Sequence, residues 1–217
     1  MDSYYDLVLF KDIYNEYERH HKLFELISGT NYVFSSFQSD STAVEYSDHV
    51  QRFAIPNKYI VIAPCASDEH RAWESNRYKS LIDMLTKNYF VVLVGTRNER
   101  AKIEAIKNRN ERVINLAGQL KLDEVHGLLQ KCSLFIGNDS GLSHIAVRTN
   151  SPMIAIIGGG NFKRYFPYRP SGKRVFLYHM MDCFGCEWIC HLREKYCLTK
   201  VDPSEVFEKS IMLLECK

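Results

Sequence analysis

Short apolar runs alternate with longer amphipathic runs from about Asn57 onward, and this alternation constrains the fold most strongly. The apolar runs are rich in β-branched residues and predict strands at 58–63, 89–94, 112–115, 133–136, 153–157 and 174–178. The runs between and after them predict helices at 76–87, 98–107, 122–131, 142–148 and 203–215. Uninterrupted apolar strands that alternate with helices are typical of an α/β fold with a Rossmann-like parallel sheet covered on both faces.

The first 56 residues do not share this alternation. Residues 11–28 predict one amphipathic helix, and the polar stretch 31–48 predicts a connection with one short strand at 32–34. We therefore divide the chain into a helical leader or interdomain linker at 1–56 and an α/β domain at 57–217. The full length of 217 residues suits one complete domain of this class and a remainder.

The composition argues against several classes of protein. The chain carries 28 Lys and Arg against 26 Asp and Glu, a net charge of +2, so we expect no nucleic-acid partner. No stretch approaches the roughly 20 apolar residues of a transmembrane segment. The acidic start MDSYYDLVLFKD does not resemble a signal peptide, so we expect a cytoplasmic chain whose cysteines are reduced.

Parallel α/β sheets bind ligands beyond the carboxyl ends of their strands, which here are the loops 64–73, 95–99, 137–144 and 158–164. The loop 137–144 reads GNDSGLSH and lies between a strand and a helix. Asn138, Asp139, Ser140 and Gly141 would surround free backbone N–H groups at the helix N-terminus, which suits a diphosphate. His144 lies three residues further on, near enough to point back at a phosphate. The alternative is structural, with Asp139 and Ser140 as N-caps and His144 as a packed side chain.

Three segments in chain order resemble glycosyltransferase family 9, the heptosyltransferase-like enzymes of lipopolysaccharide assembly. They are N-L-A-G at 115–118 with the leucine-rich helix after it, G-N-D-S-G-L-S-H-I-A-V at 137–147, and S-P-M-I-A-I-I-G at 151–158. The D-S-G-x-x-H core is the specific part, whereas Val147-Arg148 departs from the small residues commoner in the family. The resemblance covers roughly Tyr59 to the C-terminus. It implies the C-terminal, donor-binding lobe of a GT-B glycosyltransferase, with most of the N-terminal lobe missing.

The resemblance also implies roles for residues in the other strand-end loops. Arg71 stands where the family has a lysine before a tryptophan, so it would contact the donor phosphates, although Glu74 replaces the usual proline. Glu99 would accept hydrogen bonds from ribose hydroxyls, or else stabilise the dipole of the helix that it begins. Gly158 and Gly159 would let bare backbone approach the sugar or the phosphates, unless they only make the loop flexible.

Four of the seven cysteines gather between residues 183 and 197. Cys183, Cys186, Cys190 and Cys197 follow the spacing C-x2-C-x3-C-x6-C, and four thiolates so spaced can bind zinc or iron tetrahedrally. The alternatives are reduced or disulfide-paired packing cysteines, and redox chemistry. A redox Cys-x-x-Cys usually opens a helix after a strand near the start of a chain, a context that this pair lacks.

By resemblance, the chain supplies the donor-binding half of an enzyme that moves a sugar from a nucleotide-diphosphate sugar, ADP-heptose-like, to a glycan or glycolipid acceptor. Such transfer requires no cofactor, and the enzyme would act in the cytoplasm, peripheral to the inner membrane face. The family's catalytic base belongs to the N-terminal lobe, so no catalytic residue is identified and Asp139 is not assigned this role. A separate N-terminal lobe or a second copy of the chain would complete the site. Two alternatives stay open: a catalytically inactive nucleotide-sugar-binding or metal-stapled interaction module, and a GT-B-like sugar epimerase.

Overall fold

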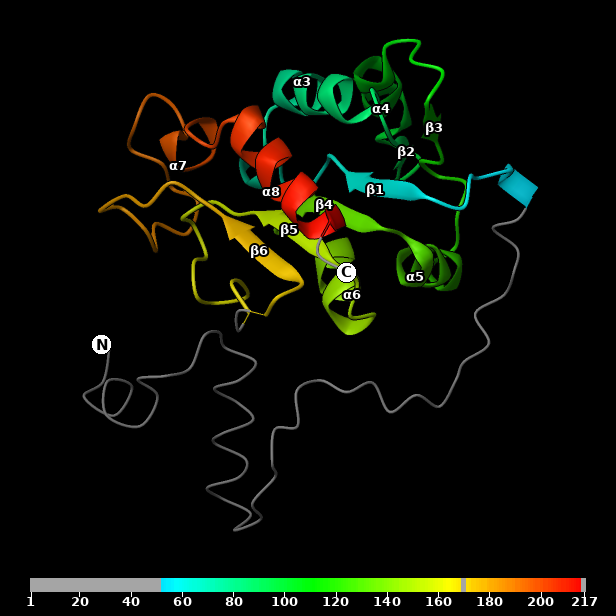
Figure 1. The fold of residues 1–217 in the computed structure, drawn as a ribbon. Helices are drawn as coiled ribbons and strands as arrows, with labels where there is room; N and C mark the ends of the chain where they lie inside the picture. The colour runs from blue at the N-terminus through cyan, green and yellow to red at the C-terminus, as the bar shows by residue number, and fades with distance from the viewer. Residues whose placement is uncertain (1–51, 169–170, 216–217) are drawn as a thin grey trace.

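A six-stranded parallel sheet forms the centre of the molecule (Figure 1). The computed structural model describes residues 52–168 and 171–215. The strand order is β3-β2-β1-β4-β5-β6, so the chain reverses its direction of growth between β1 and β4. Ligands bind at such a switch point in doubly wound α/β folds. The strands are β1 Tyr59–Ala63, β2 Phe90–Leu93, β3 Val113–Asn115, β4 Leu134–Asn138, β5 Met153–Ile156 and β6 Arg174–Leu177.

Helices cover both faces of the sheet. One hydrophobic cluster joins residues of α3, α4 and α8 to one face, and a second joins α5 and α6 to the other, as the view in Figure 1 also shows. Within the described ranges, no helix is long and apolar enough to cross a lipid bilayer. The helices are η2 Glu69–Arg71 (a 3-10 helix), α3 Ser75–Leu85, α4 Arg100–Lys107, α5 Leu122–Lys131, α6 Gly141–Arg148, α7 Tyr196–Thr199 and α8 Pro203–Glu215.

The sequence alternation has a simple physical basis in the strands. In β1, Ile60 and Ile62 enter the cluster under α3, whereas Tyr59 and Val61 enter the cluster under α5. All five residues of β1 and of β4 are buried, because a parallel strand at the middle of the sheet has a helix layer on each side. This is why the central strands are apolar without interruption.

The predicted α/β fold is confirmed, and its strands and helices agree with the structure to within a few residues. The difference between prediction and structure that matters most for the candidate site lies at residues 137–144. There β4 continues to Asn138, two residues beyond the predicted end, because Asn138 still pairs with Ile156 of β5. Only Asp139 and Ser140 then separate the strand from α6, so the turn is tight. The predicted helix at 11–28 and strand at 32–34 lie outside the described residues.

Candidate functional site

A cavity of about 600 Å³ lies beyond the carboxyl ends of β1, β2, β3 and β4. Its volume lies in the range of small-molecule binding sites. The apolar part of its lining is contributed by Val94, Leu116, Leu120, Leu142 and Ile145, among others. Its polar edge includes Ser67, Thr96, Arg97, Glu99, Ser140 and Gly141. An apolar slot with a polar rim is suited to a ligand that has a flat ring system and a charged end.

The N-terminus of α6 opens onto this cavity. Ser140 is the N-cap residue but makes no capping hydrogen bond within the described chain, and its buried Oγ has no partner there either. A side chain added at Gly141 would find no described atom within 4 Å of its Cβ. The first N–H groups of α6 therefore lack a side-chain cap and face open space. Such a terminus attracts anions through its N–H groups and the helix dipole.

Arg71 lies near enough to Asp139 for its charge to act on that carboxyl, although it is not among the residues that line the cavity, and its predicted contact with donor phosphates stays a prediction. Burial raises the pKa of Asp139, which is only 5% exposed, and the charge of Arg71 partly offsets this increase. The Nε atom of Arg71 is buried and has no hydrogen-bond partner among the described residues. Two unpaired donors, Arg71 Nε and Ser140 Oγ, thus accompany the uncapped helix terminus. Unpaired buried polar atoms cost free energy, so they are rare in proteins and are typical of a site that binds a ligand.

Asn138 supports the site from inside the protein. Its Oδ1 accepts hydrogen bonds from the backbone N–H of Trp73 at 2.9 Å and from the Tyr78 hydroxyl at 3.0 Å. Its Nδ2 lies 3.4 Å from the carbonyl oxygens of Ala63 and Cys65. Because the side chain is fully buried and its groups are used in this way, it ties the loop after β1 to the end of β4. We had expected Asn138 among the ligand-contacting residues, and its observed neighbours are all protein groups.

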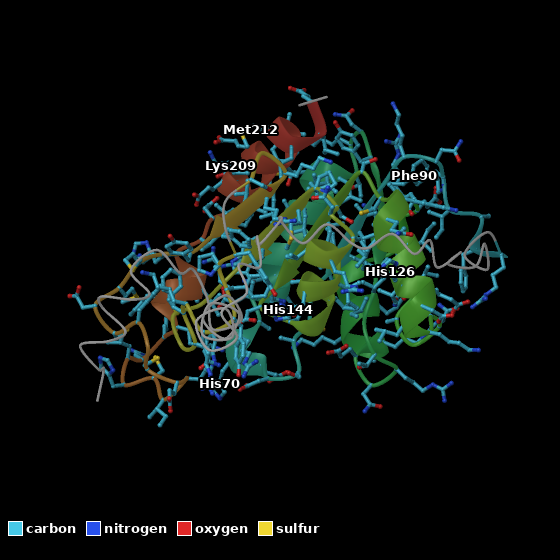
Figure 2. The ribbon with its side chains drawn as sticks, turned by 90° about the horizontal axis from the view of Figure 1, so that it is seen from below. His70, Phe90, His126, His144, Lys209 and Met212 are labelled. Carbon is cyan, nitrogen blue, oxygen red and sulfur yellow. The ribbon has the colours of Figure 1, made fainter. Side chains whose placement is uncertain are left out.

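His144 points into an aromatic cluster. Its Nδ1 is 2.9 Å from the Tyr168 hydroxyl, and its ring centroid is 4.5 Å from that of Phe166. Burial lowers the pKa of His144, so the ring is neutral at physiological pH. Figure 2 shows His144 near the middle of the molecule in a view from below. The predicted contact between His144 and a phosphate stays a prediction, and Tyr168 is a neighbour that the sequence reading missed.

Glu99 closes the turn that follows β2. Its Oε2 accepts hydrogen bonds from the backbone N–H of Thr96 at 2.6 Å and from the Thr96 hydroxyl at 2.9 Å. The residue also lines the cavity at its polar rim. Glu99 therefore has a structural contact and a position from which it can reach a ligand, so both readings of this residue survive.

Gly158 and Gly159 are buried beneath aromatic rings. A Cβ at Gly158 would lie 2.6 Å from Trp188 Cη2, and one at Gly159 would lie 2.3 Å from Phe184 Cδ1. Both rings belong to the cysteine-bearing segment, which we define as residues 181–197. Packing against this segment, rather than the expected approach to a sugar or phosphate, is what the structure shows for the two glycines.

The four clustered cysteines line one small cavity together with Trp188 and Lys195. All four thiols are free. Burial raises the pKa of Cys197, and the nearby Cys183, Cys186 and Cys190 raise it further. In the described ranges, however, no three His, Cys, Asp or Glu side chains are already gathered as a metal-binding group. The four thiols therefore line the same cavity but are not arranged as the ligands of a metal site.

Two residues at the site escaped the sequence reading. Cys65 follows β1 and lines the cavity, and burial raises the pKa of its thiol to about 11. Trp73 is 1% exposed and donates its indole N–H to the Val201 carbonyl at 3.1 Å. The place of Cys65 shortly after β1 was a signal, whereas Trp73 lies between η2 and α3 and its partner Val201 is far away in the sequence.

Comparison with known proteins assigns the chain to a family. The model of glycosyltransferase family 9 (heptosyltransferase) matches residues 11–187, which is most of the chain. The chain therefore belongs to glycosyltransferase family 9. The match begins earlier than the sequence motifs alone indicated.

Individual relatives agree with this family. Lipooligosaccharide heptosyltransferase 2 of Haemophilus influenzae is 36% identical over 94 residues, which are 41% of this chain and 27% of that protein. The structure of the ADP-heptose lps heptosyltransferase II of Escherichia coli is similar with a TM-score of 0.65 and 25% identity, covering 78% of this chain and 51% of that one. The chain thus spans about half the length, or less, of the relatives that it matches.

One further structural neighbour has the same fold. The iron-containing dodecameric glycosyltransferase TibC of enterotoxigenic Escherichia coli matches with a TM-score of 0.54 and 19% identity. The match covers 74% of this chain and 45% of TibC. At this identity the similarity concerns the fold alone.

Proposed function

We propose that this chain binds a nucleotide-diphosphate sugar, ADP-heptose-like, and supplies the donor half of a glycosyltransferase acting on a lipopolysaccharide-type acceptor. The observation that carries the proposal is the uncapped N-terminus of α6 at one edge of the cavity, together with an Arg71 close enough for its charge to act on Asp139, two residues before that helix. Family membership and heptosyltransferase relatives support the same chemistry.

The diphosphate would bind at the N-terminus of α6. The N–H groups near Ser140 and Gly141 and the guanidinium of Arg71 together provide donors and positive charge without a metal ion. The same groups would stabilise the nucleoside diphosphate as it leaves, because negative charge accumulates there when the bond to the sugar breaks. Burial raises the pKa of Asp139, and the charge of Arg71 partly offsets this increase.

The nucleoside would occupy the apolar slot. Leu116, Leu120 and Leu142 offer flat apolar contact to a base, and Glu99 at the rim would accept hydrogen bonds from the ribose hydroxyls. The catalytic base stays unassigned, because a buried Asp139 beside the phosphates is poorly placed to take the acceptor's proton. A further lobe, or another copy of the chain, would supply the acceptor site on the cytoplasmic face of the inner membrane.

Isothermal titration with ADP, GDP and UDP tests the donor site. We expect ADP to bind, and Arg71→Ala to weaken its binding by about tenfold or more, since a charge-assisted contact to phosphate is lost. Arg112→Ala is the matched control, because Arg112 stacks on Phe90 at the opposite end of the strands. Failure of all three nucleotides to bind at millimolar concentration would refute the proposal.

Transfer itself is a separate question from donor binding. Incubating the chain with ADP-heptose and a truncated lipopolysaccharide acceptor, alone and with a candidate partner lobe, measures it directly. Product formed by the chain alone would exclude the inactive-module alternative. Donor binding without transfer under any of these conditions would favour that alternative.

We also propose that the cysteine-bearing segment binds iron or zinc. Four thiols that line one cavity form a donor set that suits either metal, although they are not gathered at ligand positions here. A bound metal would cross-link the segment and so stabilise it. TibC, a structural neighbour, is described as iron-containing.

Metal content after purification without chelator tests this second proposal. We expect about one metal ion per chain, lost in Cys183→Ser/Cys186→Ser and retained in Cys65→Ser, whose thiol lies in the other cavity. The melting temperature should fall on chelation in the wild-type chain and in Cys65→Ser, but not in Cys183→Ser/Cys186→Ser. Metal-free protein that also ignores added zinc and iron would end the proposal.

A further inference from the structure

The loop that carries Arg71 is too short to hold this side chain by itself. η2 contains only the three residues Glu69–Arg71, and none of them is buried. Its N-cap Asp68 accepts one hydrogen bond, from the backbone N–H of His70 at 2.8 Å. Figure 2 shows His70, the neighbour of Arg71, at the edge of the molecule. A single turn of 3-10 helix with one cap has little internal stability, so contacts from elsewhere must fix the direction of Arg71.

One such contact comes from Asn138, whose Oδ1 accepts the backbone N–H of Trp73, and two more come from the two ends of α7. Lys195, the N-cap residue of α7, donates from Nζ to the carbonyl oxygen of Glu69 at 3.1 Å. Val201, just beyond the C-cap of the same helix, accepts the indole N–H of Trp73 at 3.1 Å in a buried hydrogen bond. Glu69 lies two residues before Arg71 and Trp73 lies two residues after it. α7 therefore holds the Arg71 loop on both sides.

α7 is itself part of the cysteine-bearing segment. Cys197 lies within it, and the Cys197 carbonyl accepts the backbone N–H of His179 at 3.2 Å. Lys195 and Cys197 line the same small cavity as the other three clustered cysteines. The segment is also bonded to the end of β5, where Gly185 N–H donates to the Gly159 carbonyl at 2.8 Å. The cysteine-bearing segment, which contacts the Arg71 loop, is thus itself attached to the sheet.

The other side of the same loop is bound to α4. The Glu69 carboxylate forms an ion pair with Lys102 at 2.9 Å, and both side chains are well exposed. An exposed ion pair contributes little to stability. The Lys195 bond differs because it reaches the backbone of η2, whose carbonyl also accepts the N–H of Ala72. Movement of Lys195 would therefore move the backbone that carries Arg71.

We propose that Lys195 is a positioning residue for Arg71, so that the cysteine-bearing segment sets the affinity of the site for the donor diphosphate. The inference rests on the proposed function, in which Arg71 contacts the phosphates. Lys195 would affect donor affinity without contacting the donor. Its ammonium group is bonded to the backbone of η2, and the Arg71 guanidinium is the group that reaches the ligand. This gives the cysteine-bearing segment a role in recognition in addition to packing.

The first test compares three variants of the full chain by titration with ADP. Lys195→Met should weaken ADP binding about fivefold, the equivalent of one ordinary hydrogen bond, because the Lys195 bond to η2 is exposed. Lys195→Arg, which can reach the same carbonyl, should restore binding to within about twofold of the wild type. Lys200→Met is the control, because it removes an equal charge at the other end of α7, where the ammonium stacks on Tyr196. Equal losses in Lys195→Met and Lys200→Met would overturn the positioning role.

The second test is a double-mutant cycle with Arg71→Ala. If Lys195 acts through Arg71, adding Lys195→Met to Arg71→Ala should change the ADP dissociation constant by less than about twofold. Fully additive losses would mean that Lys195 acts independently, and would overturn the inference. Faster amide hydrogen exchange in residues 69–73 of Lys195→Met, with a normal melting temperature, is expected without any ligand.

The outcomes separate the inference from its premise. No ADP binding by the wild-type chain would refute the proposed function, and the positioning role would fall with it. ADP binding that Lys195→Met leaves unchanged, with unchanged exchange at 69–73, would refute the positioning role alone.

Discussion

Gly141 and the glycines after β5 lie at the same sheet edge in opposite surroundings. Gly95, Gly118 and Gly141 all border the cavity; a Cβ at Gly95 or Gly118 would lie 2.6 Å from Ile103 or Arg97, whereas Gly141 has open space where a side chain would be. At the end of β5, the space over Gly158, Gly159 and Gly160 is filled by the rings of Trp188 and Phe184. A glycine after a strand thus indicates that the space of a side chain is needed there. It does not indicate whether a ligand or another part of the protein fills that space.

Polar groups distinguish the two parts of this sheet edge less sharply. On the open side, Arg71 Nε and Ser140 Oγ are buried without partners in the described chain. On the filled side, Trp188 Nε1 is also buried without a partner in the described chain, but backbone bonds reach the glycine carbonyls, with Glu187 N–H donating to Gly160 at 2.9 Å. The two sides therefore differ in their open space and in these paired carbonyls, and not in having unpaired donors.

The largest effect is expected from filling the closed side. A Cβ at Gly160 would lie 2.3 Å from Trp188 Cδ2, so Gly160→Val should lower the free energy of unfolding by about 3 kcal/mol through overpacking. Gly172→Val is the control, since its Cβ meets no described atom within 4 Å. Urea denaturation measures both. Similar midpoints for the two variants would contradict the observed docking of Trp188.

The same substitution on the open side should affect binding instead of folding. Gly141→Val should leave the denaturation midpoint close to that of the wild type, because space is available for its side chain. It should weaken ADP binding about tenfold, since the new side chain obstructs the N–H groups of α6. Titration calorimetry and denaturation on one sample distinguish the two effects. A stability loss as large as that of Gly160→Val would abolish the contrast between the two sides.

A smaller change is expected at the rim of the open cavity. Glu99→Gln should weaken ADP binding about threefold by reducing the strength of hydrogen bonds from ribose, which corresponds to less than about 1 kcal/mol. Binding of inorganic pyrophosphate, which has no ribose, should not change. If both ligands lose affinity equally, Glu99 acts only by closing the Thr96 turn.

The smallest effect concerns His144, which lies at the border of the two parts. Because burial lowers its pKa in the folded state, the unfolded state binds more protons below about pH 6.5, and folding stability falls as the pH decreases through that range. The loss should stay below about 1 kcal/mol. His144→Gln keeps a partner for Tyr168 but cannot titrate, so its melting temperature should depend less on pH between about 7.5 and 5.5. Identical pH profiles of the melting temperature for the wild type and His144→Gln would show that other groups determine the pH dependence of stability.

Local patterns were sufficient for the fold and for the place of the site. Runs such as YIVIA and MIAI gave strands because a parallel strand must be apolar on both faces, and α5 begins and ends where its periodicity does. The turn from β4 into α6 was located correctly at the carboxyl edge of the sheet, although Gly137 and Asn138 belong to β4 itself.

Contacts between distant segments were beyond reach of the sequence. Nothing in the pattern around Gly158 indicates that Trp188 will cover it, because residues 181–195 have no regular periodicity. The bonds of Asn138 to Trp73 and Tyr78 span 65 and 60 residues of chain and depend on the completed sheet. The pairing of His144 with Tyr168 likewise depends on how the loop after β5 returns to α6.

The two bonds from α7 have a consequence for the order of folding. Lys195 and Glu69 are 126 residues apart, and Trp73 and Val201 are 128 apart, so both bonds close very long loops. Closing such loops is slow, because chain entropy must be lost before the contacts form. During synthesis, the ribosome releases β1 and η2 long before α7. The loop that carries Arg71 therefore gains its contacts with α7 only after all six strands of the sheet have been synthesised.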